Sequence, residues 1–327
     1  MTAGEAPTTE LLAGLDLAAF RQAVLAWFDS RGRVFPFRGT TDPYLVLVSE
    51  VLLQQTQISR GGPAWVRFTA TFPTVEALAA ASPAAVLRAW QGLGYNRRAV
   101  NLQRAARIIV NELGGQVPST VAGLEALPGV GPYTARAVAS IAFKVPVGAV
   151  DTNVRRVLGR VLAGDRAAVR PAELQRAADR IVDLEQPDDW THALMDIGST
   201  LCRPLRPRCA ECPVATMCRY AAGERPAGPG AVPTGRAIPG GRAIPAGRTV
   251  TTGPAELAFS RSSRWLRGRI LDQLRAAPDD AWTLVPATIG EHDASAIRTA
   301  LAALERDHLL ELDRSDPGQP RARLPIA

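Results

Sequence analysis

The stretch LPGVGPYTARAVASIAFKVPVGAVDTNVRR, residues 127–156, constrains the fold of this chain more than any other. LPGVG has the composition of a tight turn between two helices, because Pro128 cannot continue the first helix and Gly129 and Gly131 can take positive φ without a Cβ clash. A phosphate can therefore approach the backbone N–H groups of Gly129, Val130 and Gly131. The next helix starts at the following proline and turns its positive dipole end toward the same spot. We expect this turn to bind a DNA phosphate.

Asp151 ends a short apolar run and is followed by the polar Thr152 and Asn153. Base-excising or phosphate-handling chemistry beside an anchored DNA strand would use such a carboxylate. Residues 127–135 and 150–156 resemble the helix-hairpin-helix and the catalytic aspartate of the endonuclease III and MutY superfamily of DNA glycosylases. A helix-hairpin-helix that only grips DNA, with Asp151 as a helix cap, is the alternative. This stretch alone leaves both open.

The four cysteines have the spacing Cys-x6-Cys-x2-Cys-x5-Cys. In a cytosolic protein, thiols this close together indicate metal ligands rather than two disulfides. The spacing permits structural zinc or a 4Fe-4S cluster. It also resembles the cluster loop of endonuclease III and MutY, and this resemblance implies a structural 4Fe-4S cluster, with zinc as the alternative. The ligands would be Cys202, Cys209, Cys212 and Cys218.

The segment YLVLVSEVLLQQTQI, residues 44–58, places Glu50 among apolar side chains of an expected helix. Such a carboxyl is desolvated, which raises its pKa and suits a general acid. A glutamate that pairs at the helix surface is the alternative. SEVLLQQTQ closely resembles MutY, and the resemblance implies that Glu50 is the catalytic acid and that Gln54 inserts into the DNA stack. Gln55 is expected to contact DNA as well.

Two further segments resemble MutY with one departure each. FPFRG is similar to the family's LPWR segment, retains Arg38 as a candidate DNA contact, and has Phe37 in place of tryptophan. GLGYNRRAVNL is similar to GLGYYARARNL. The resemblance implies that Tyr95 is the aromatic side chain that inserts between bases beside the lesion; an aromatic packed between helices is the alternative. Asn96 replaces the second tyrosine of the family's segment.

The expected fold class is mainly α: a two-lobed helix-hairpin-helix glycosylase fold with an iron-sulfur loop, plus a small winged-helix-like C-terminal domain. Apolar residues at helical spacing and turn signals delimit its helices, the first after an N-cap at Asp16. The expected domains are a flexible N-terminus (1–15), the glycosylase domain (16–222), a Pro/Gly/Arg linker (223–253) and the winged-helix-like domain (254–327). Within the glycosylase domain we expect a six-helix lobe at 35–145 and an iron-sulfur lobe formed by 16–34 together with 146–222.

The C-terminal residues depart from typical MutY proteins, whose C-terminal domain resembles a nucleotide pyrophosphohydrolase and reads 8-oxoguanine. Here two amphipathic helices are followed by LLELD and RARLP, which are expected to pair as strands, in the order of a winged helix. Residues 253–327 hold ten arginines against eleven acids. Contact with DNA, docking of a protein and a purely structural role all remain open for this domain.

The net charge of +7 and a pI of about 9.9 suit a polyanionic partner. No apolar run approaches the roughly 20 residues of a membrane span, and residues 1–10 lack the pattern of a signal peptide. We therefore expect a monomer in the cytoplasm, associated with the nucleoid, whose partner is double-stranded DNA with a mispaired or damaged base, and no membrane contact.

The resemblance implies a monofunctional glycosylase that hydrolyses the N-glycosidic bond of a flipped adenine opposite 8-oxoguanine or G. Glu50 would protonate the base, Asp151 would stabilise positive charge on the sugar, and Tyr133 and Asn153 would complete the site. Tyr133 stands where bifunctional relatives carry a Schiff-base lysine, and Lys144 is the only lysine, so no efficient β-lyase activity is expected. Excision of uracil, thymine or a modified base, and a non-catalytic DNA-binding regulator, are the alternatives.

Overall fold

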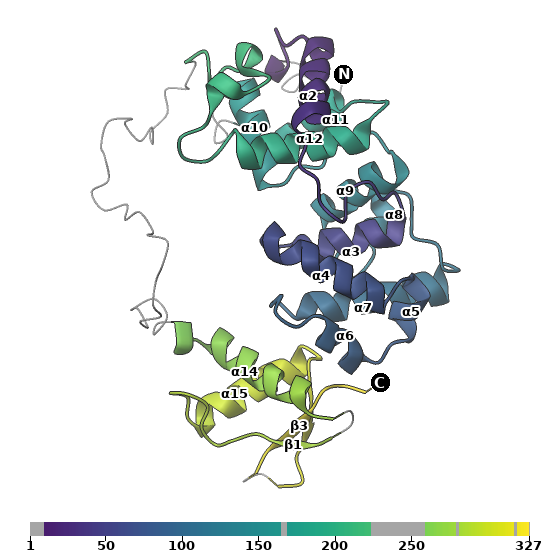
Figure 1. Ribbon diagram of the computed structural model, residues 1–327, viewed down its shortest axis with the longest axis vertical. Helices are drawn as coiled ribbons and strands as arrows, with labels where there is room; N and C mark the ends of the chain where they lie inside the picture. The colour runs from purple at the N-terminus through teal and green to yellow at the C-terminus, as the bar shows by residue number, and fades with distance from the viewer. Residues whose placement is uncertain (1–9, 165–168, 224–258, 279–280, 317–318, 327) are drawn as a thin grey trace, which may run out of the picture. The chain divides into compact units, whose positions relative to one another are not determined.

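The computed structural model describes residues 10–164, 169–223, 259–278, 281–316 and 319–326. The chain is mainly helical, which confirms the predicted fold class (Figure 1). It divides into two compact units, Met1–Thr69 with Ile108–Pro229 and Ala70–Arg107 with Gly230–Ala327. The predicted linker, apart from Gly223, lies outside the described residues.

The first unit is built from helices joined by short turns. In this unit, side chains that cap helix N-termini set several of the starts. Asp16 Oδ1 accepts a hydrogen bond of 3.0 Å from the Ala19 backbone N–H, which confirms the predicted N-cap. The elements are α2 (Leu17–Arg31), α3 (Pro43–Leu53), α4 (Ile58–Thr71, which ends in the second unit), α8 (Val121–Glu125), α9 (Pro132–Phe143), α10 (Thr152–Ala163), α11 (Pro171–Ile181), α12 (Pro187–Thr200) and the 3-10 turns η2 (Cys209–Glu211) and η3 (Ala215–Met217).

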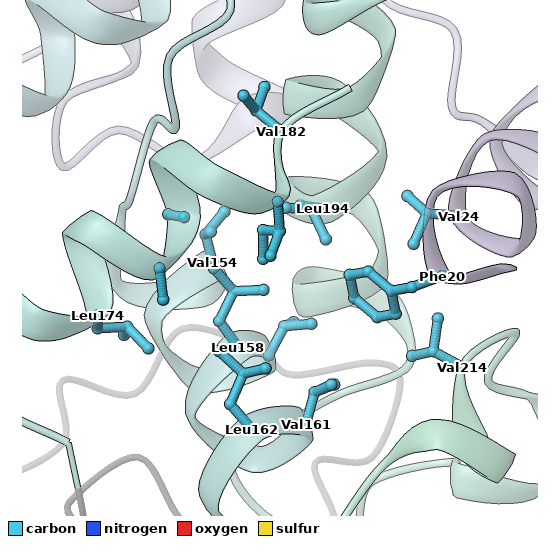
Figure 2. Packing of buried hydrophobic residues seen from close by; sticks show 14 of the residues in the cluster. Phe20, Val24, Val154, Leu158, Val161, Leu162, Leu174, Val182, Leu194 and Val214 are labelled. Atoms are coloured by element: carbon cyan, nitrogen blue, oxygen red, sulfur yellow. The ribbon is translucent and has the colours of Figure 1, made fainter. Parts of the chain in front are cut away.

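One hydrophobic core joins α2, α10, α11 and α12 (Figure 2). Phe20 of α2 packs edge-on against Trp190 of α12, with ring centroids 5.7 Å apart. Figure 2 shows Leu158 of α10 and Leu194 of α12 in the same cluster. Leu12 also packs into it, so core packing begins before the predicted domain start at residue 16. This core fixes the start of α10 relative to α12.

The second unit contains helices and one small sheet. Its elements are α5 (Val75–Ala80), α6 (Pro83–Ala89), α7 (Arg97–Glu112, which ends in the first unit), α14 (Ser263–Ala276), β1 (Thr283–Leu284), α15 (Ala294–Arg306), β2 (Glu311–Asp313) and β3 (Arg321–Arg323). The sheet is antiparallel with the order β1-β3-β2, and Leu312 lies opposite Ala322. The predicted pairing of LLELD with RARLP is therefore confirmed, while strand β1 was not predicted.

Short turns near residues 72–74, 82–83 and 92–94 separate helices α4, α5, α6 and α7. Helix α4 begins at Ile58 and includes Pro63 in its second turn. Within the described residues, no helix combines the length and the apolar character that crossing a bilayer requires.

Candidate active site

Glu50 lies on α3 and is buried, with 9% of its surface exposed. Burial raises the pKa of its carboxyl from the ordinary 4.5 to about 7. The hydrogen bond with Tyr133 lowers this pKa, the negative charge of Asp151 raises it, and the positive charge of Arg38 lowers it. Glu50 is thus a carboxyl that still holds its proton near neutral pH. The predicted desolvation of this residue is confirmed.

Tyr133 follows directly from the hairpin. Gly129 has a φ of 80°, as predicted, because the turn needs a left-handed residue there. Gly131 has a φ of −95° and so does not use the positive φ that glycine allows: it is the N-cap of α9 in extended conformation, with Pro132 as the first helical residue. One residue later the Tyr133 hydroxyl meets the Glu50 carboxyl and lies 3.8 Å from Met195 Sδ. Burial raises the pKa of Tyr133 well above its usual range, so the phenol stays protonated.

Asp151 is the N-cap of α10. Its Oδ1 accepts hydrogen bonds from the backbone N–H groups of Asn153 (2.8 Å) and Val154 (2.6 Å), and its Oδ2 accepts one from Asn153 Nδ2 (2.9 Å). The same carboxylate acts electrostatically on Glu50. The helix cap that the sequence offered as one alternative is therefore present, and three N–H groups donate to this carboxyl. The catalytic role of Asp151 stays a prediction.

Arg156 connects this site to the cysteine loop, and the sequence analysis missed it. It is buried on α10, one turn after Asn153, and its Nη2 donates to Asn153 Oδ1 (2.9 Å) and to the Gly198 carbonyl (2.6 Å). Its Nε donates to the Cys202 carbonyl at 2.6 Å. The i,i+3 spacing of an amide and an arginine was the available signal. Arg156 thereby holds the Asn153 amide in the orientation that presents Nδ2 to Asp151.

Asp196 of α12 is fully buried and binds two arginines. Arg33 donates to it through its backbone N–H (2.9 Å) and its guanidinium (2.8 Å), and Arg38 donates two hydrogen bonds of 2.7 and 2.8 Å. The Arg38 guanidinium also lies 5.0 Å from the centroid of the Phe35 ring. Phe37 stacks on Phe35 at 5.3 Å. Since Arg38 is largely committed to Asp196, its contact with DNA stays a prediction.

The other candidate DNA contacts lie in both units. In the first unit, Gln54 ends α3 and its Nε2 donates to Thr134 Oγ1 at 3.1 Å, and Gln55 is exposed with a φ of 54°. The hairpin residue Val130 is buried. In the second unit, Tyr95 has a φ of 46° and is 45% exposed. Their roles on DNA stay predictions.

The predicted metal ligands lie in the loop after α12. Cys202, Cys209, Cys212 and Cys218 are free thiols and line one pocket, together with apolar side chains such as Val157 and Val214. Arg160 of α10 donates to Cys202 Sγ at 3.3 Å. In the described part of the chain, no three Cys, His, Asp or Glu side chains form a group that could hold one metal ion.

Burial, together with the three other thiols, raises the pKa of Cys212 to about 11. Four adjacent thiolates would repel one another unless a cation neutralised them, so the four cysteines are candidate metal ligands. The 4Fe-4S cluster stays a prediction. His192 belongs to a different environment, since its ring stacks on Phe28 and burial lowers its pKa to about 4. It is a neutral side chain of the packed interior.

Lys144 lies at the C-terminal end of α9, where it has a φ of 53°. Its Nζ pairs with Asp188 Oδ2 at 3.3 Å. Tyr133 is at the opposite end of the same helix, which separates the two residues by roughly 16 Å at 1.5 Å per residue. The only lysine of the sequence thus lies at the opposite end of α9 from Tyr133.

Known proteins match this arrangement. The family described as HhH-GPD superfamily base excision DNA repair protein matches residues 48–183. The adenine DNA glycosylase of Mycolicibacterium smegmatis is 40% identical over 257 residues, which covers 77% of this chain and 79% of that protein. The adenine DNA glycosylase of Rattus norvegicus is 43% identical over 216 residues, 62% of this chain and 42% of that protein.

The chain spans only about two fifths of the length of the mammalian relatives that it matches. Among solved structures, a thermostable thymine-DNA glycosylase superposes with a TM-score of 0.60 and 29% identity, covering 63% of this chain and 97% of that one. The predicted helix-hairpin-helix glycosylase fold is thereby confirmed. Because the similarity to the mycobacterial relative extends over most of both chains, the protein belongs to the adenine DNA glycosylase family of the HhH-GPD superfamily.

Proposed function

We propose that the chain is a DNA N-glycosylase that removes a flipped adenine mispaired with 8-oxoguanine or G. The observation that carries the proposal is the pair of carboxyl groups at the hairpin: Glu50, whose pKa is about 7, beside the N-capping carboxylate of Asp151. Glu50 is buried, whereas Asp151 accepts three N–H hydrogen bonds at a helix N-terminus, and two acids in such different surroundings are suited to separate tasks in one reaction. The matched adenine DNA glycosylases give the reaction class.

In this mechanism Glu50 donates its proton to a ring nitrogen of the leaving adenine. As the glycosidic bond breaks, positive charge develops on the deoxyribose, and the Asp151 carboxylate stabilises it. Tyr133 holds the Glu50 carboxyl by its hydroxyl, and Asn153 holds Asp151 by its amide. Water then adds to the sugar cation and gives a proton to the Glu50 carboxylate, which restores the acid for the next turnover. Because Asp151 is fixed at a helix terminus, little reorganisation accompanies the step.

The enzyme is a monofunctional glycosylase without efficient β-lyase activity. A β-lyase needs an amine that forms a Schiff base with the sugar, and Tyr133 stands beside Glu50 where such an amine would be required. Lys144 is bound to Asp188 at the other end of α9. Base removal therefore leaves an intact strand with an abasic site.

A 4Fe-4S cluster is the proposed cofactor, held by Cys202, Cys209, Cys212 and Cys218. Four free thiols around a cavity support a cluster rather than one ion. The cluster would tie the loop to α10, where Arg160 contacts a ligand sulfur. Its role is structural, since its proposed ligands lie in the loop after α12 rather than at the carboxyl pair. Iron and sulfide analysis of anaerobically purified protein, with a zinc assay as its control, tests this assignment.

The test of the activity is single-turnover excision on matched duplexes, followed by alkali to reveal abasic sites. The duplexes carry adenine opposite 8-oxoguanine, G or C, and thymine or uracil opposite G. Release of adenine from the first two, and its loss in Glu50→Gln with DNA binding retained, is expected. A regulator without catalysis would bind all of these duplexes and release no base from any of them.

A second candidate within the enzyme class is removal of thymine or uracil from a mismatch with G. The similarity to a thymine-DNA glycosylase structure favours this candidate. The carboxyl pair serves either reaction, because protonating the base and stabilising the sugar are common to both. Activity on thymine or uracil alone would establish this second candidate.

The proposed partner is double-stranded DNA with a mispaired or damaged base, bound by a monomer in the cytoplasm and at the nucleoid. The hairpin N–H groups at Gly129 and Gly131 and the charge of +7 support it. The C-terminal elements have the order and the sheet pairing of a winged helix, which supports the proposed domain 254–327. The C-terminal domain here means the described residues from Phe259 onward.

A further inference from the structure

Tyr95 has the features of a nucleic-acid contact in the second unit. It is a large aromatic side chain with 45% of its surface exposed, and its φ of 46° is a left-handed conformation that a tyrosine rarely adopts. The two glycines before it, Gly92 and Gly94, also have positive φ, of 82° and 67°. A strained turn that exposes an aromatic ring persists only when the surrounding structure holds it. Exposed aromatic rings near cations are typical platforms for unstacked bases.

Arg264, from α14 of the C-terminal domain, lies on this ring. Its Cζ is 4.6 Å from the centroid of Tyr95, and Arg98 of α7 approaches the same ring at 5.7 Å. A Cβ placed on Gly94 would lie 3.9 Å from Arg264 Nη2, so the guanidinium follows the turn closely. Arg264 itself is exposed. The C-terminal domain thus supplies a cation to the exposed ring.

Asn96, the residue that departs from the MutY pattern, is the second point of contact. Its Oδ1 accepts a hydrogen bond of 2.8 Å from Arg275 Nη2, while Arg275 Nε donates to the Leu87 carbonyl at 2.9 Å. The Arg275 side chain is 6% exposed. In return, Arg88 of α6 donates to the Arg275 carbonyl at 3.2 Å. Tyrosine, which MutY has at this position, lacks the amide oxygen that accepts this hydrogen bond. Asn96 therefore makes a contact with Arg275 of the C-terminal domain that the MutY residue could not make in the same way.

We propose that the C-terminal domain positions the DNA-contacting turn, with Arg264 holding the Tyr95 ring and Arg275 holding Asn96. Arg264 is then a positioning residue that acts through Tyr95 rather than a direct phosphate ligand. The inference rests on the proposed function for its ligand, duplex DNA, but not on which base is removed. It gives the C-terminal residues a role in DNA binding although their net charge is not basic.

A double-mutant cycle between Arg264 and Tyr95 tests this positioning role. Affinity for a duplex with adenine opposite 8-oxoguanine is measured by fluorescence anisotropy in a Glu50→Gln background, where turnover is blocked. Arg264→Ala is expected to weaken binding about two- to fivefold, the size of an exposed cation–π contact. Tyr95→Ala is expected to weaken binding more than Arg264→Ala does. The double variant is expected to bind as weakly as Tyr95→Ala alone. Arg264→Lys restores most of the affinity.

Arg261→Ala is the matched control, because Arg261 carries the same charge in the same segment but pairs with Glu291 instead. Equal losses in Arg261→Ala and Arg264→Ala, or losses that simply add in the double variant, overturn the proposal. The proposal is also overturned if Arg264→Ala reduces the slope of log affinity against log salt concentration by about 0.9 in magnitude, because such a change marks a lost phosphate contact. If the parent chain binds the duplex but excises no base, the proposed function fails while the cycle still decides the inference.

Discussion

Asn153 donates two hydrogen bonds to Asp151, one from its backbone N–H at 2.8 Å and one from Nδ2 at 2.9 Å. The aspartate is at once the cap of α10 and the carboxylate that acts on Glu50. Substitution of Asp151 can separate these two roles, because asparagine caps a helix as well as aspartate does but carries no charge.

We therefore expect Asp151→Asn to change the free energy of unfolding by less than about 1 kcal/mol and to lower excision about a hundredfold or more. Urea unfolding and single-turnover excision of adenine measure the two effects. Asp16→Asn at the cap of α2 is the matched control, since it changes a capping aspartate remote from Glu50. A chain that keeps its excision rate in Asp151→Asn would show that the carboxylate acts only as a cap.

The sequence pointed to the candidate residues of this site more readily than to the hydrogen bonds and ion pairs that hold them in place. Glu50 and Asp151 are found by local signals: an acid within an apolar helix, and an acid before a helix start. The contacts of Asp196 with Arg33 and Arg38 join residues about 160 positions apart, and no local pattern encodes them. The left-handed conformation of Tyr95 was also unpredictable from its residue type, because its neighbours in space impose it.

Glu50→Gln is expected to stabilise the folded protein at neutral and higher pH. The pKa of Glu50 is raised from 4.5 to about 7 on folding, so the folded chain binds more protons than the unfolded chain between these values. The free energy of unfolding therefore falls as the pH rises from 4.5 through 7, and the fall reaches about 3 kcal/mol in total once the pH is above 7. Glutamine has no proton to lose in this range, so Glu50→Gln avoids this loss.

Urea unfolding of both proteins from pH 5 to pH 8 checks the prediction. The difference in free energy of unfolding should be small near pH 5 and should level off above pH 7. A difference that does not depend on pH would mean that Glu50 has an ordinary pKa in the folded chain. Glu76→Gln is the control, because Glu76 is an exposed glutamate whose hydrogen bonds lower its pKa, so this variant should lack the stabilisation above pH 7.

Gly198→Ala is expected to destabilise the chain by about 1 to 3 kcal/mol and to disturb Asn153. A Cβ on Gly198 would lie 2.7 Å from Asn153 Cβ and 3.1 Å from its carbonyl carbon, so α12 and α10 would have to separate. Gly268→Ala in α14 is the matched control: nothing lies within 4 Å of its Cβ position, and alanine favours a helix. Thermal unfolding should give a lower melting temperature for the first variant and an equal or higher one for the second.

Asp196→Asn is expected to cost about 3 to 5 kcal/mol, because it leaves Arg33 and Arg38 without a counter-charge at a fully buried position. Glu305→Gln breaks the surface pair with Arg314 and should cost less than about 1 kcal/mol. Urea unfolding compares the two variants. Similar costs for both would contradict the view that Asp196 organises the segment that carries Arg38.

The proposal that this chain lacks β-lyase activity rests on Tyr133, and it can be tested by covalent trapping. The parent chain should form no covalent complex with a DNA substrate under borohydride, since its only lysine, Lys144, is bound to Asp188 at the far end of α9. Tyr133→Lys places an amine at the N-terminal end of α9, next to Glu50 and Asp151, where burial and the helix dipole lower its pKa. We expect this variant to be trapped by borohydride. Lys144→Arg is the control, made both in the parent chain and in Tyr133→Lys. If Lys144→Arg abolishes the covalent complex, Lys144 forms the bond, and the reacting sugar does not lie at the Tyr133 end of α9.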